Sequence, residues 1–199
     1  MATKYILQSG GVRNYPDKKK LWHAEIVKTA PKNPKVLVCL FTVPRELWEE
    51  KYPSYCASFL EDMSADVKPE FRMASPDTFV DNCTWADIVY CLGGDDALAK
   101  YWFSRFDLPK VWQSKIVSVN SASSDALATH YFTCDWRDCN DGLGILPIKF
   151  LPHFKSSYGA DDPRGPVDWE KGLSDLKAYG NTELPVYALE EGDFIVVEQ

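Results

Sequence analysis

The alternation of strand-like and helix-like segments constrains the fold of this chain more than any other feature of its sequence. Apolar runs typical of buried strands occupy residues 4–8, 35–41, 67–73, 87–92, 115–119, 144–150, 186–189 and 194–197. Helical spacing of apolar residues occurs near 21–27 and in 44–60, 95–103, 121–129 and 167–179. Apolar strands separated by helices predict a mostly parallel sheet covered on both faces and joined by right-handed crossovers. The predicted fold class is therefore α/β, a three-layer α/β/α sandwich.

Length and composition favour one domain spanning residues 1–199. The chain has 199 residues, which is closer to one typical domain of about 150 residues than to two. Apolar residues make up 45% of the chain and charged residues 26%, so the chain can bury a sizeable core and is not of a disordered or low-complexity class. No linker and no internal repeat interrupts it.

The charge balance argues against nucleic acid as a partner. Acidic residues number 29 and basic residues 22, which gives a formal net charge of -7. A chain of this charge has no net positive field to attract phosphate backbones or anionic lipids. The segment MATKYILQSGG lacks the apolar core of a secretion signal, and the longest apolar run, 36–41, is too short to cross a membrane. We therefore expect a cytoplasmic protein with no membrane contact.

The six cysteines are expected to be reduced, and no metal site is expected. Cys39 and Cys91 lie inside strand-like runs, and no export signal is present. Cys134 and Cys139 are close in sequence but have no nearby histidine. They therefore lack the paired spacing of a zinc site.

The chemistry of this chain is expected where the strands end, because open α/β sheets bind ligands beyond the carboxyl ends of their strands. The turns that begin at Gly10, Gly93 and Asn120 lie at this edge. Ser121 follows a strand and opens a helix, as in a nucleophile elbow, where backbone N–H groups can hold an oxyanion. The pair Gly93 and Gly94 offers further N–H groups without side-chain obstruction.

A catalytic role for Ser121 requires two further groups. A serine hydroxyl needs a general base, and an imidazole base needs a carboxylate that fixes its tautomer. His153 is the candidate base, and Asp135, Asp138 and Asp141 are the candidate acids. The alternative is that Ser121 only caps a helix and that His153 is a structural residue of a turn.

Five segments carry a resemblance to a known family. They read YILQSGG, ADIVYCLGGDDALAKYW, VNSASSDALA, GLGILPIKFLPHF and LPVYALEEGDFIVVE. In this order they resemble peptidase family S51, which includes dipeptidase E and the cyanophycinases, over nearly the whole chain. The resemblance implies a flavodoxin-like sandwich of the class I glutamine amidotransferase-like superfamily. It also implies a serine hydrolase with a Ser-His-Asp or Ser-His-Glu arrangement.

The resemblance also assigns roles by position. Ser121 matches the nucleophile, His153 the base and Asp135 the acid. Gly93 or Gly94, together with Ala122, matches the N–H groups of the oxyanion hole.

The elbow itself departs from the family pattern GxSAGA or GxSAGAN, because Val119 and Ser123 replace its two glycines. If these side chains crowd the turn and relax it, the Ser121 hydroxyl would move out of line with the scissile carbonyl. A displacement of about 1 Å can lower the rate by about 100-fold.

Two functions therefore stay open. The first is a serine hydrolase resembling dipeptidase E that cleaves a short peptide or isopeptide through a Ser-His-Asp arrangement. The second is a catalytically inactive S51-like homologue that binds a small molecule or a protein.

Glutaminase activity is not expected, because the elbow carries serine instead of cysteine. The segment SGGVRNY does not complete a nucleotide-binding loop. We expect no cofactor, and a monomer or homodimer.

Overall fold

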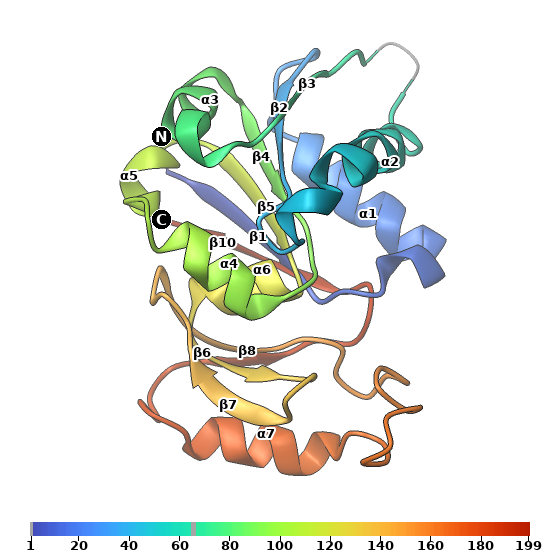
Figure 1. Ribbon diagram of the computed structural model, residues 1–199, viewed down its shortest axis with the longest axis vertical. Coiled ribbons are helices and arrows are strands. Elements are labelled where there is room, and N and C mark those ends of the chain that lie inside the picture. The colour runs from blue at the N-terminus through green and yellow to red at the C-terminus, as the bar shows by residue number, and fades with distance from the viewer. Residues whose placement is uncertain (1, 65–66) are drawn as a thin grey trace.

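The main sheet has six strands in the order β10-β1-β5-β4-β2-β3. A computed structural model describes residues 2–64 and 67–199 (Figure 1). The strands of this sheet are β1 (Lys4–Gln8), β2 (Lys35–Cys39), β3 (Glu70–Met73), β4 (Ile88–Cys91), β5 (Ile116–Asn120) and β10 (Phe194–Glu198). Among the described strands of this sheet, only the pair β1 and β10 is antiparallel.

Helices cover both faces of this sheet, which confirms the predicted three-layer sandwich (Figure 1). One side carries α1 (Pro16–Val27) and α2 (Trp48–Leu60), and the other carries α3 (Phe79–Trp85), α4 (Asp96–Phe103) and α5 (Leu108–Val111). Three short 3-10 helices lie at η1 (Val12–Asn14), η2 (Arg45–Leu47) and η3 (Pro76–Thr78).

Aromatic side chains fill both interfaces between the sheet and its helices. Tyr90 of β4 packs against Trp22 of α1 and Phe59 of α2, with ring centroids 5.6 and 5.2 Å apart. Phe79 and Trp112 pack together in the layer of α3 and α5, with centroids 6.4 Å apart. All five are buried, so the two layers form a continuous aromatic core.

A second, smaller sheet was not expected from the sequence. It has the order β7-β6-β8-β9, with strands β6 (Ala128–Thr133), β7 (Asp138–Asp141), β8 (Leu146–Leu151) and β9 (Val186–Ala188). Helix α7 (Trp169–Ala178) packs on its far side (Figure 1). The strands predicted at 144–150 and 186–189 therefore exist but belong to this sheet. Apolar periodicity identifies a buried strand without saying which sheet it joins.

The helix predicted at 121–129 ends earlier than expected. Helix α6 spans Ala122–Leu127, and the chain becomes β6 at Ala128. Because α6 packs against α4 and against β6 and β8, it connects the main sheet to the second one.

The strand order determines where the functional loops meet. Strands β1, β5 and β4 are neighbours and parallel, so their carboxyl ends open on one edge. Strands β8 and β9 are parallel neighbours in the second sheet, so the loops that follow them also lie together. Within residues 2–64 and 67–199, none of the helices combines the length and apolar character needed to span a bilayer.

Candidate active site

Ser121 lies in a strained turn between β5 and α6. Its backbone has φ 47° and ψ -113°, which non-glycine residues rarely adopt. The turn is held by hydrogen bonds: Ser121 donates its N–H to the Gln8 carbonyl at 2.8 Å, and Ser124 Oγ donates to the same carbonyl at 3.1 Å. The structure thus places Ser121 in a strained backbone conformation at the turn from a strand into a helix.

His153 follows β8 and reaches this turn. Its Nε2 lies 3.1 Å from Ser121 Oγ. The His153 backbone N–H donates to Ser9 Oγ at 2.9 Å, and Ser9 Oγ donates to the Leu189 carbonyl at 2.8 Å. His153 also has a positive φ of 55°. The second sheet and the turn after β1 therefore fix the imidazole together.

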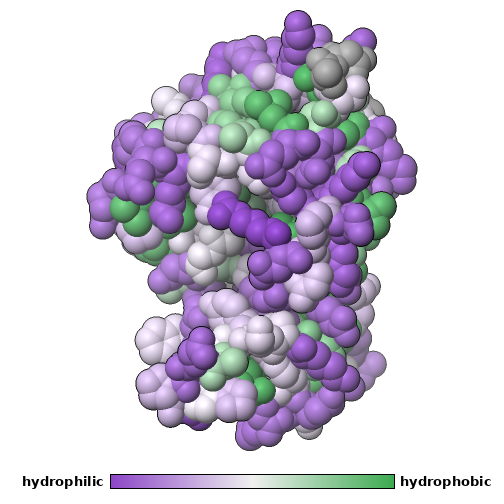
Figure 2. All heavy atoms as spheres, turned by 90° about the vertical axis from the view of Figure 1, so that its right-hand side faces the viewer, coloured by the Kyte–Doolittle hydropathy of each residue, from purple (hydrophilic) through white to green (hydrophobic). Residues whose placement is uncertain are grey.

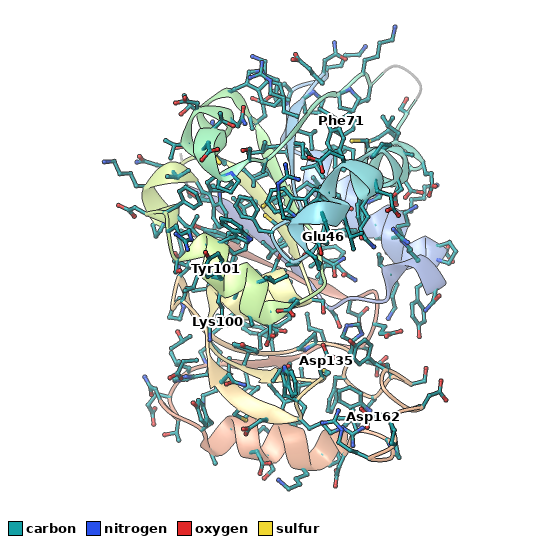
Figure 3. The ribbon with its side chains drawn as sticks, viewed as in Figure 1. Glu46, Phe71, Lys100, Tyr101, Asp135 and Asp162 are labelled. Carbon is teal, nitrogen blue, oxygen red and sulfur yellow. The ribbon has the colours of Figure 1, made fainter. Side chains whose placement is uncertain are left out.

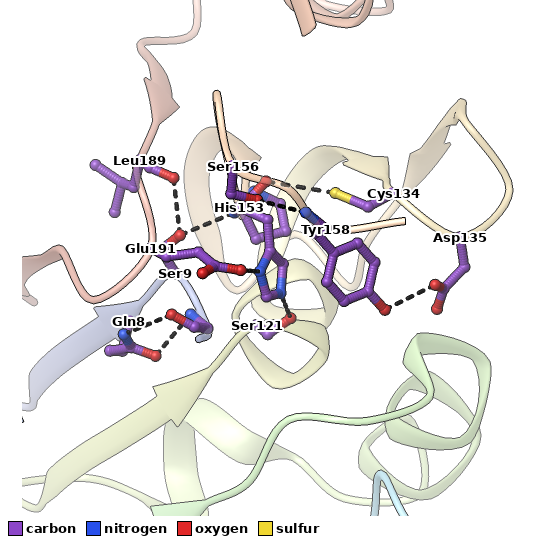
Figure 4. A network of polar contacts seen from close by, with 12 residues as sticks. Gln8, Ser9, Ser121, Cys134, Asp135, His153, Ser156, Tyr158, Leu189 and Glu191 are labelled. Carbon is purple, nitrogen blue, oxygen red and sulfur yellow. Dashed lines mark hydrogen bonds and ion pairs between the residues drawn. The ribbon is translucent and has the colours of Figure 1, made fainter. Parts of the chain in front are cut away.

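Glu191 completes a chain of three polar side chains (Figure 4). Its Oε1 lies 2.8 Å from His153 Nδ1, and the two side chains are only 10% and 8% exposed. Burial lowers the pKa of His153, while the hydrogen bond and charge of Glu191 act to raise it. The net direction is downward, so the imidazole is neutral near pH 7 and can accept a proton at Nε2.

The acids predicted from the sequence lie elsewhere, which corrects that assignment. Asp135, in the turn between β6 and β7, accepts a hydrogen bond from Tyr158 Oη at 2.8 Å (Figures 3 and 4). Asp141 pairs with His130 Nδ1 at 2.8 Å, and Asp138 accepts from the Cys139 N–H. Both belong to β7, which β6 separates from β8 and His153.

Glu191 is not among the acids predicted from the sequence, because it lies 38 positions after His153 and only the fold brings the two together. It follows a strand-like run, 186–189, inside a segment that carries the family resemblance. The pair of acids Glu190 and Glu191 directly after this strand-like run was therefore the available signal. Strand β9 pairs in parallel with β8, and this pairing places the loop after β9, which contains Glu191, beside His153.

The two glycines after β1 make room for the His153 and Glu191 side chains. A Cβ atom on Gly10 would lie 2.3 Å from His153 Cε1, and one on Gly11 would lie 2.3 Å from Glu191 Cδ. Both glycines also have positive φ, 100° and 65°. The sequence predicts a turn at Gly10, and the structure adds that Gly10 and Gly11 pack against the His153 and Glu191 side chains.

The residues expected to supply oxyanion N–H groups lie close to Ser121. Gly93 lies so near that its Cβ would stand 3.3 Å from Ser121 Cβ. Ala122 is the first residue of α6, where N–H groups have no partner within the helix. Gly94 and Ala122 line one small recess together with Ser121 and His153. The residues predicted for an oxyanion hole are therefore brought together with the serine.

A larger pocket opens over this arrangement. It has a volume of about 450 Å³ and is lined by Ser121, His153, Gly93, Arg13 and Tyr55, among others. Figure 2 shows the hollow at the waist of the molecule, with hydrophilic side chains around it. The volume is in the range of small-molecule and peptide sites.

Two solved structures share this architecture. The crystal structure of a peptidase from an acI-B1 Actinobacterium matches 99% of this chain and 84% of its own, with a TM-score of 0.68 and 17% identity. A protein from Listeria monocytogenes EGD-e, provisionally assigned as Peptidase E, matches 100% of this chain and 98% of its own, with a TM-score of 0.62 and 14% identity. The chain has a peptidase E-like fold. No protein-family model and no curated protein sequence matches it.

Within this peptidase E-like fold, the two residues that replace the elbow glycines are accommodated. Val119 is fully buried in β5. Ser123 is buried and donates its hydroxyl to the Leu92 carbonyl at the end of β4. Neither side chain separates Ser121 from His153, since the 3.1 Å contact is present.

No metal-binding group is evident in the described part of the chain. Among residues 2–64 and 67–199, no three or more His, Cys, Asp or Glu side chains are grouped to hold a metal ion. Cys134 and Cys139 are both buried as free thiols.

Proposed function

We propose that this chain is a serine hydrolase that cleaves a short peptide or isopeptide through Ser121, His153 and Glu191. The observation that carries the proposal is the unbroken chain of contacts from Ser121 Oγ to His153 Nε2, 3.1 Å, and from His153 Nδ1 to Glu191 Oε1, 2.8 Å. Ser121, at one end of this chain of contacts, lines the pocket of about 450 Å³. Nucleophile, base and orienting acid are thus in hydrogen-bond reach at a ligand-sized opening.

The first step forms an ester. Ser121 Oγ attacks the scissile carbonyl carbon while His153 Nε2 takes the hydroxyl proton, and Glu191 stabilises the imidazolium through Nδ1–H. The N–H groups of Gly93 or Gly94 and of Ala122 then receive the oxyanion. The tetrahedral intermediate collapses as Nε2–H protonates the leaving amine, which breaks the C–N bond.

The second step restores the enzyme. A water molecule gives its proton to the neutral His153 Nε2 and attacks the ester carbonyl. The second tetrahedral intermediate breaks the bond to Ser121 Oγ, which takes the proton back from His153. The products are one carboxylic acid and one amine for each water consumed.

A peptide substrate is favoured by the fold and by the lining of the pocket. The two structural neighbours are described as peptidases. Arg13 lines the pocket and lies over the Tyr55 ring, 5.5 Å from its centroid. An exposed guanidinium at the rim offers a partner for a carboxylate, such as the one at the end of a short peptide.

The proposal is tested by covalent labelling. We expect a fluorophosphonate to modify the purified protein at Ser121, as shown by mass spectrometry of its peptides, and we expect Ser121→Ala to abolish labelling. Ser104→Ala is the matched control, because this exposed serine follows α4 and its hydroxyl donates to the Tyr101 carbonyl, away from the site. Turnover of short acidic peptides, followed by release of the free amine, supplies the second readout.

The competing function is a binding module without catalysis. It predicts that the folded wild-type protein stays unlabelled and turns over no peptide, although ligands still bind in the pocket. That result would refute the hydrolase.

A further inference from the structure

The phenol ring of Tyr158 lies against the imidazole of His153. The centroids of the two rings are 4.2 Å apart, and their planes are 27° from parallel (Figure 4). Aromatic rings in contact usually have centroids about 4.5–7 Å apart. The phenol ring of Tyr158 is therefore packed closely on one face of the proposed base.

The far end of the Tyr158 side chain is held by a carboxylate. Its Oη donates to Asp135 Oδ1 at 2.8 Å. Tyr158 belongs to the loop between β8 and α7 and is 36% exposed. A side chain as exposed as this one has several rotamers open to it unless a contact selects one. A hydrogen bond to an ionised carboxylate is among the stronger contacts that can do so.

Two arginines make Asp135 a firm anchor, because they join its turn to the loop that carries Tyr158. Arg164 Nη2, from the loop, donates to the Asp135 carbonyl at 2.7 Å. Arg137, from the turn, donates through Nη2 to the Gly165 carbonyl. The turn after β6 and the loop before α7 therefore hold each other in place. The bond from Tyr158 to Asp135 is a third connection between them.

The proposed reaction depends on this contact most when His153 changes partner. Two polar contacts hold the imidazole, one from Nδ1 to Glu191 and one from Nε2 to Ser121. The second is lost as Ser121 Oγ forms the ester, and Nε2–H must then point at the leaving amine. An imidazole with a single hydrogen bond can tilt about it. A ring packed on its face opposes that tilt.

The contact also suits the charge that His153 acquires. The imidazole becomes an imidazolium when it takes the Ser121 proton, and the face of a phenol ring attracts cations. Tyr158 therefore interacts more strongly with His153 after the proton transfer than before it. Only interactions that strengthen toward the transition state accelerate a reaction.

We infer that Tyr158 is a positioning residue for the base: its ring, anchored by Asp135, holds the His153 imidazole in line with Ser121 and the leaving amine. The inference rests on the proposed hydrolase function. It gives Asp135 an indirect part in the reaction, through Tyr158.

The rate at which a fluorophosphonate labels Ser121 tests this inference without a peptide substrate. A small probe is preferable because Tyr158 also lines the pocket of about 450 Å³. We expect Tyr158→Leu to lower the rate by about 100-fold, the effect of displacing a reacting group by about 1 Å. Tyr158→Phe keeps the ring and loses only its hydrogen bond, so we expect a loss of about 3- to 10-fold. Tyr101→Leu, which replaces an exposed tyrosine of α4, should keep the wild-type rate.

A double-mutant cycle tests whether Asp135 acts through Tyr158. Asp135→Ala removes the acceptor but keeps the carbonyl that Arg164 binds. We expect it to slow labelling as much as Tyr158→Phe does. The variant with both changes should be no slower than either alone, because both remove the same hydrogen bond. Losses that multiply would show that Asp135 acts on His153 by another route and would overturn the inference.

The Nδ1–H proton of His153 supplies a readout that does not depend on a rate. In proton NMR spectra we expect its downfield resonance to be sharp in the wild-type protein and in Tyr158→Phe. In Tyr158→Leu it should be broadened, because the imidazole moves. A sharp resonance in Tyr158→Leu would contradict the positioning role.

The remaining outcomes separate this inference from the hydrolase itself. Wild-type labelling of Tyr158→Leu, or equal losses in Tyr158→Leu and Tyr158→Phe, would overturn the inference and leave the hydrolase intact. If Tyr158→Leu does not fold, the cycle of Tyr158→Phe and Asp135→Ala decides alone. A folded wild-type protein that stays unlabelled would overturn the hydrolase and the inference together.

Discussion

Glu191 Oε1 lies 2.8 Å from Nδ1 of His153, although 38 residues separate the two in sequence. The contact exists because β8 and β9 run parallel side by side, so that the loops after them share one edge. Gly10 and Gly11 leave the space for it. The orientation of the imidazole thus depends on three segments that are far apart in the chain.

Replacing this carboxylate should impair catalysis more than binding. We expect Glu191→Gln to lower kcat by about 10³- to 10⁴-fold with little change in KM, because the amide no longer fixes the tautomer of His153. Asp135→Asn should reduce kcat far less, since Asp135 bonds to Tyr158. Steady-state kinetics on a short peptide measures both. A larger loss in Asp135→Asn than in Glu191→Gln would show that the wrong acid has been assigned.

The pH dependence of activity follows from the environment of His153. Burial lowers the pKa of His153 from its ordinary 6.5, and Glu191 opposes the shift. The base is active when neutral, so the acidic limb of kcat/KM should have its midpoint below pH 6.5. In Glu191→Gln the opposing carboxylate is gone, and the residual activity should have its midpoint at still lower pH. A midpoint above 6.5 in the wild-type protein would contradict this.

The sequence predicts the strands and helices better than it predicts their assembly. The strand-like run 4–8 coincides with β1, and Ser121 and His153 meet as expected. The residues of β6 and β7 gave no clear strand signal, because Thr, Asp, Asn and His interrupt their apolar residues. Because these strands are not predicted, the sequence does not predict the second sheet or the pairing of β8 with β9 that brings Glu191 to His153. Which strands pair is determined by contacts between residues far apart in sequence, and local apolar periodicity does not report these contacts.

A methyl group on Gly10 should disable the site without unfolding the protein. The added Cβ would lie 2.3 Å from the His153 ring, so the imidazole must move. We expect Gly10→Ala to lower kcat/KM by about 100-fold or more, the effect of a displacement near 1 Å. Gly144→Ala is the control, because Gly144 also has a positive φ, 64°, but nothing within 4 Å of the added atom. Similar activity losses in the two variants would attribute the effect to backbone strain.

Lys149 should stabilise the second sheet and its helix. Its fully buried Nζ donates to the carbonyls of Leu176, Lys177 and Tyr179 at the end of α7, at 2.8, 2.9 and 2.6 Å. Lys149→Met removes all three donors, and we expect the free energy of unfolding to fall by about 3 kcal/mol. Lys171→Met, on the exposed side of the same helix, should change it by less than about 1 kcal/mol. Urea denaturation compares the two, and equal losses would contradict the capping role.

Asp125→Asn should stabilise the folded protein near neutral pH. The pKa of Asp125 is raised in the native state by burial, Asp96 and Asp135, whereas the unfolded chain has the ordinary value of 3.8. Between these two pKa values the native state binds more protons than the unfolded state. The contribution of Asp125 to stability is therefore complete below pH 3.8 and is lost as the pH rises through the native pKa. The amide keeps the shape of the carboxyl without its charge.

The stabilising effect of Asp125→Asn should consequently depend on pH. We expect its Tm to exceed that of the wild-type protein by about 2–4 °C at pH 7.5, equivalent to about 1 kcal/mol, and by much less at pH 4. Asp138→Asn, an exposed acid on β7, should shift the Tm equally little at both values. A Tm difference that does not change with pH would contradict the buried, unpaired state of Asp125.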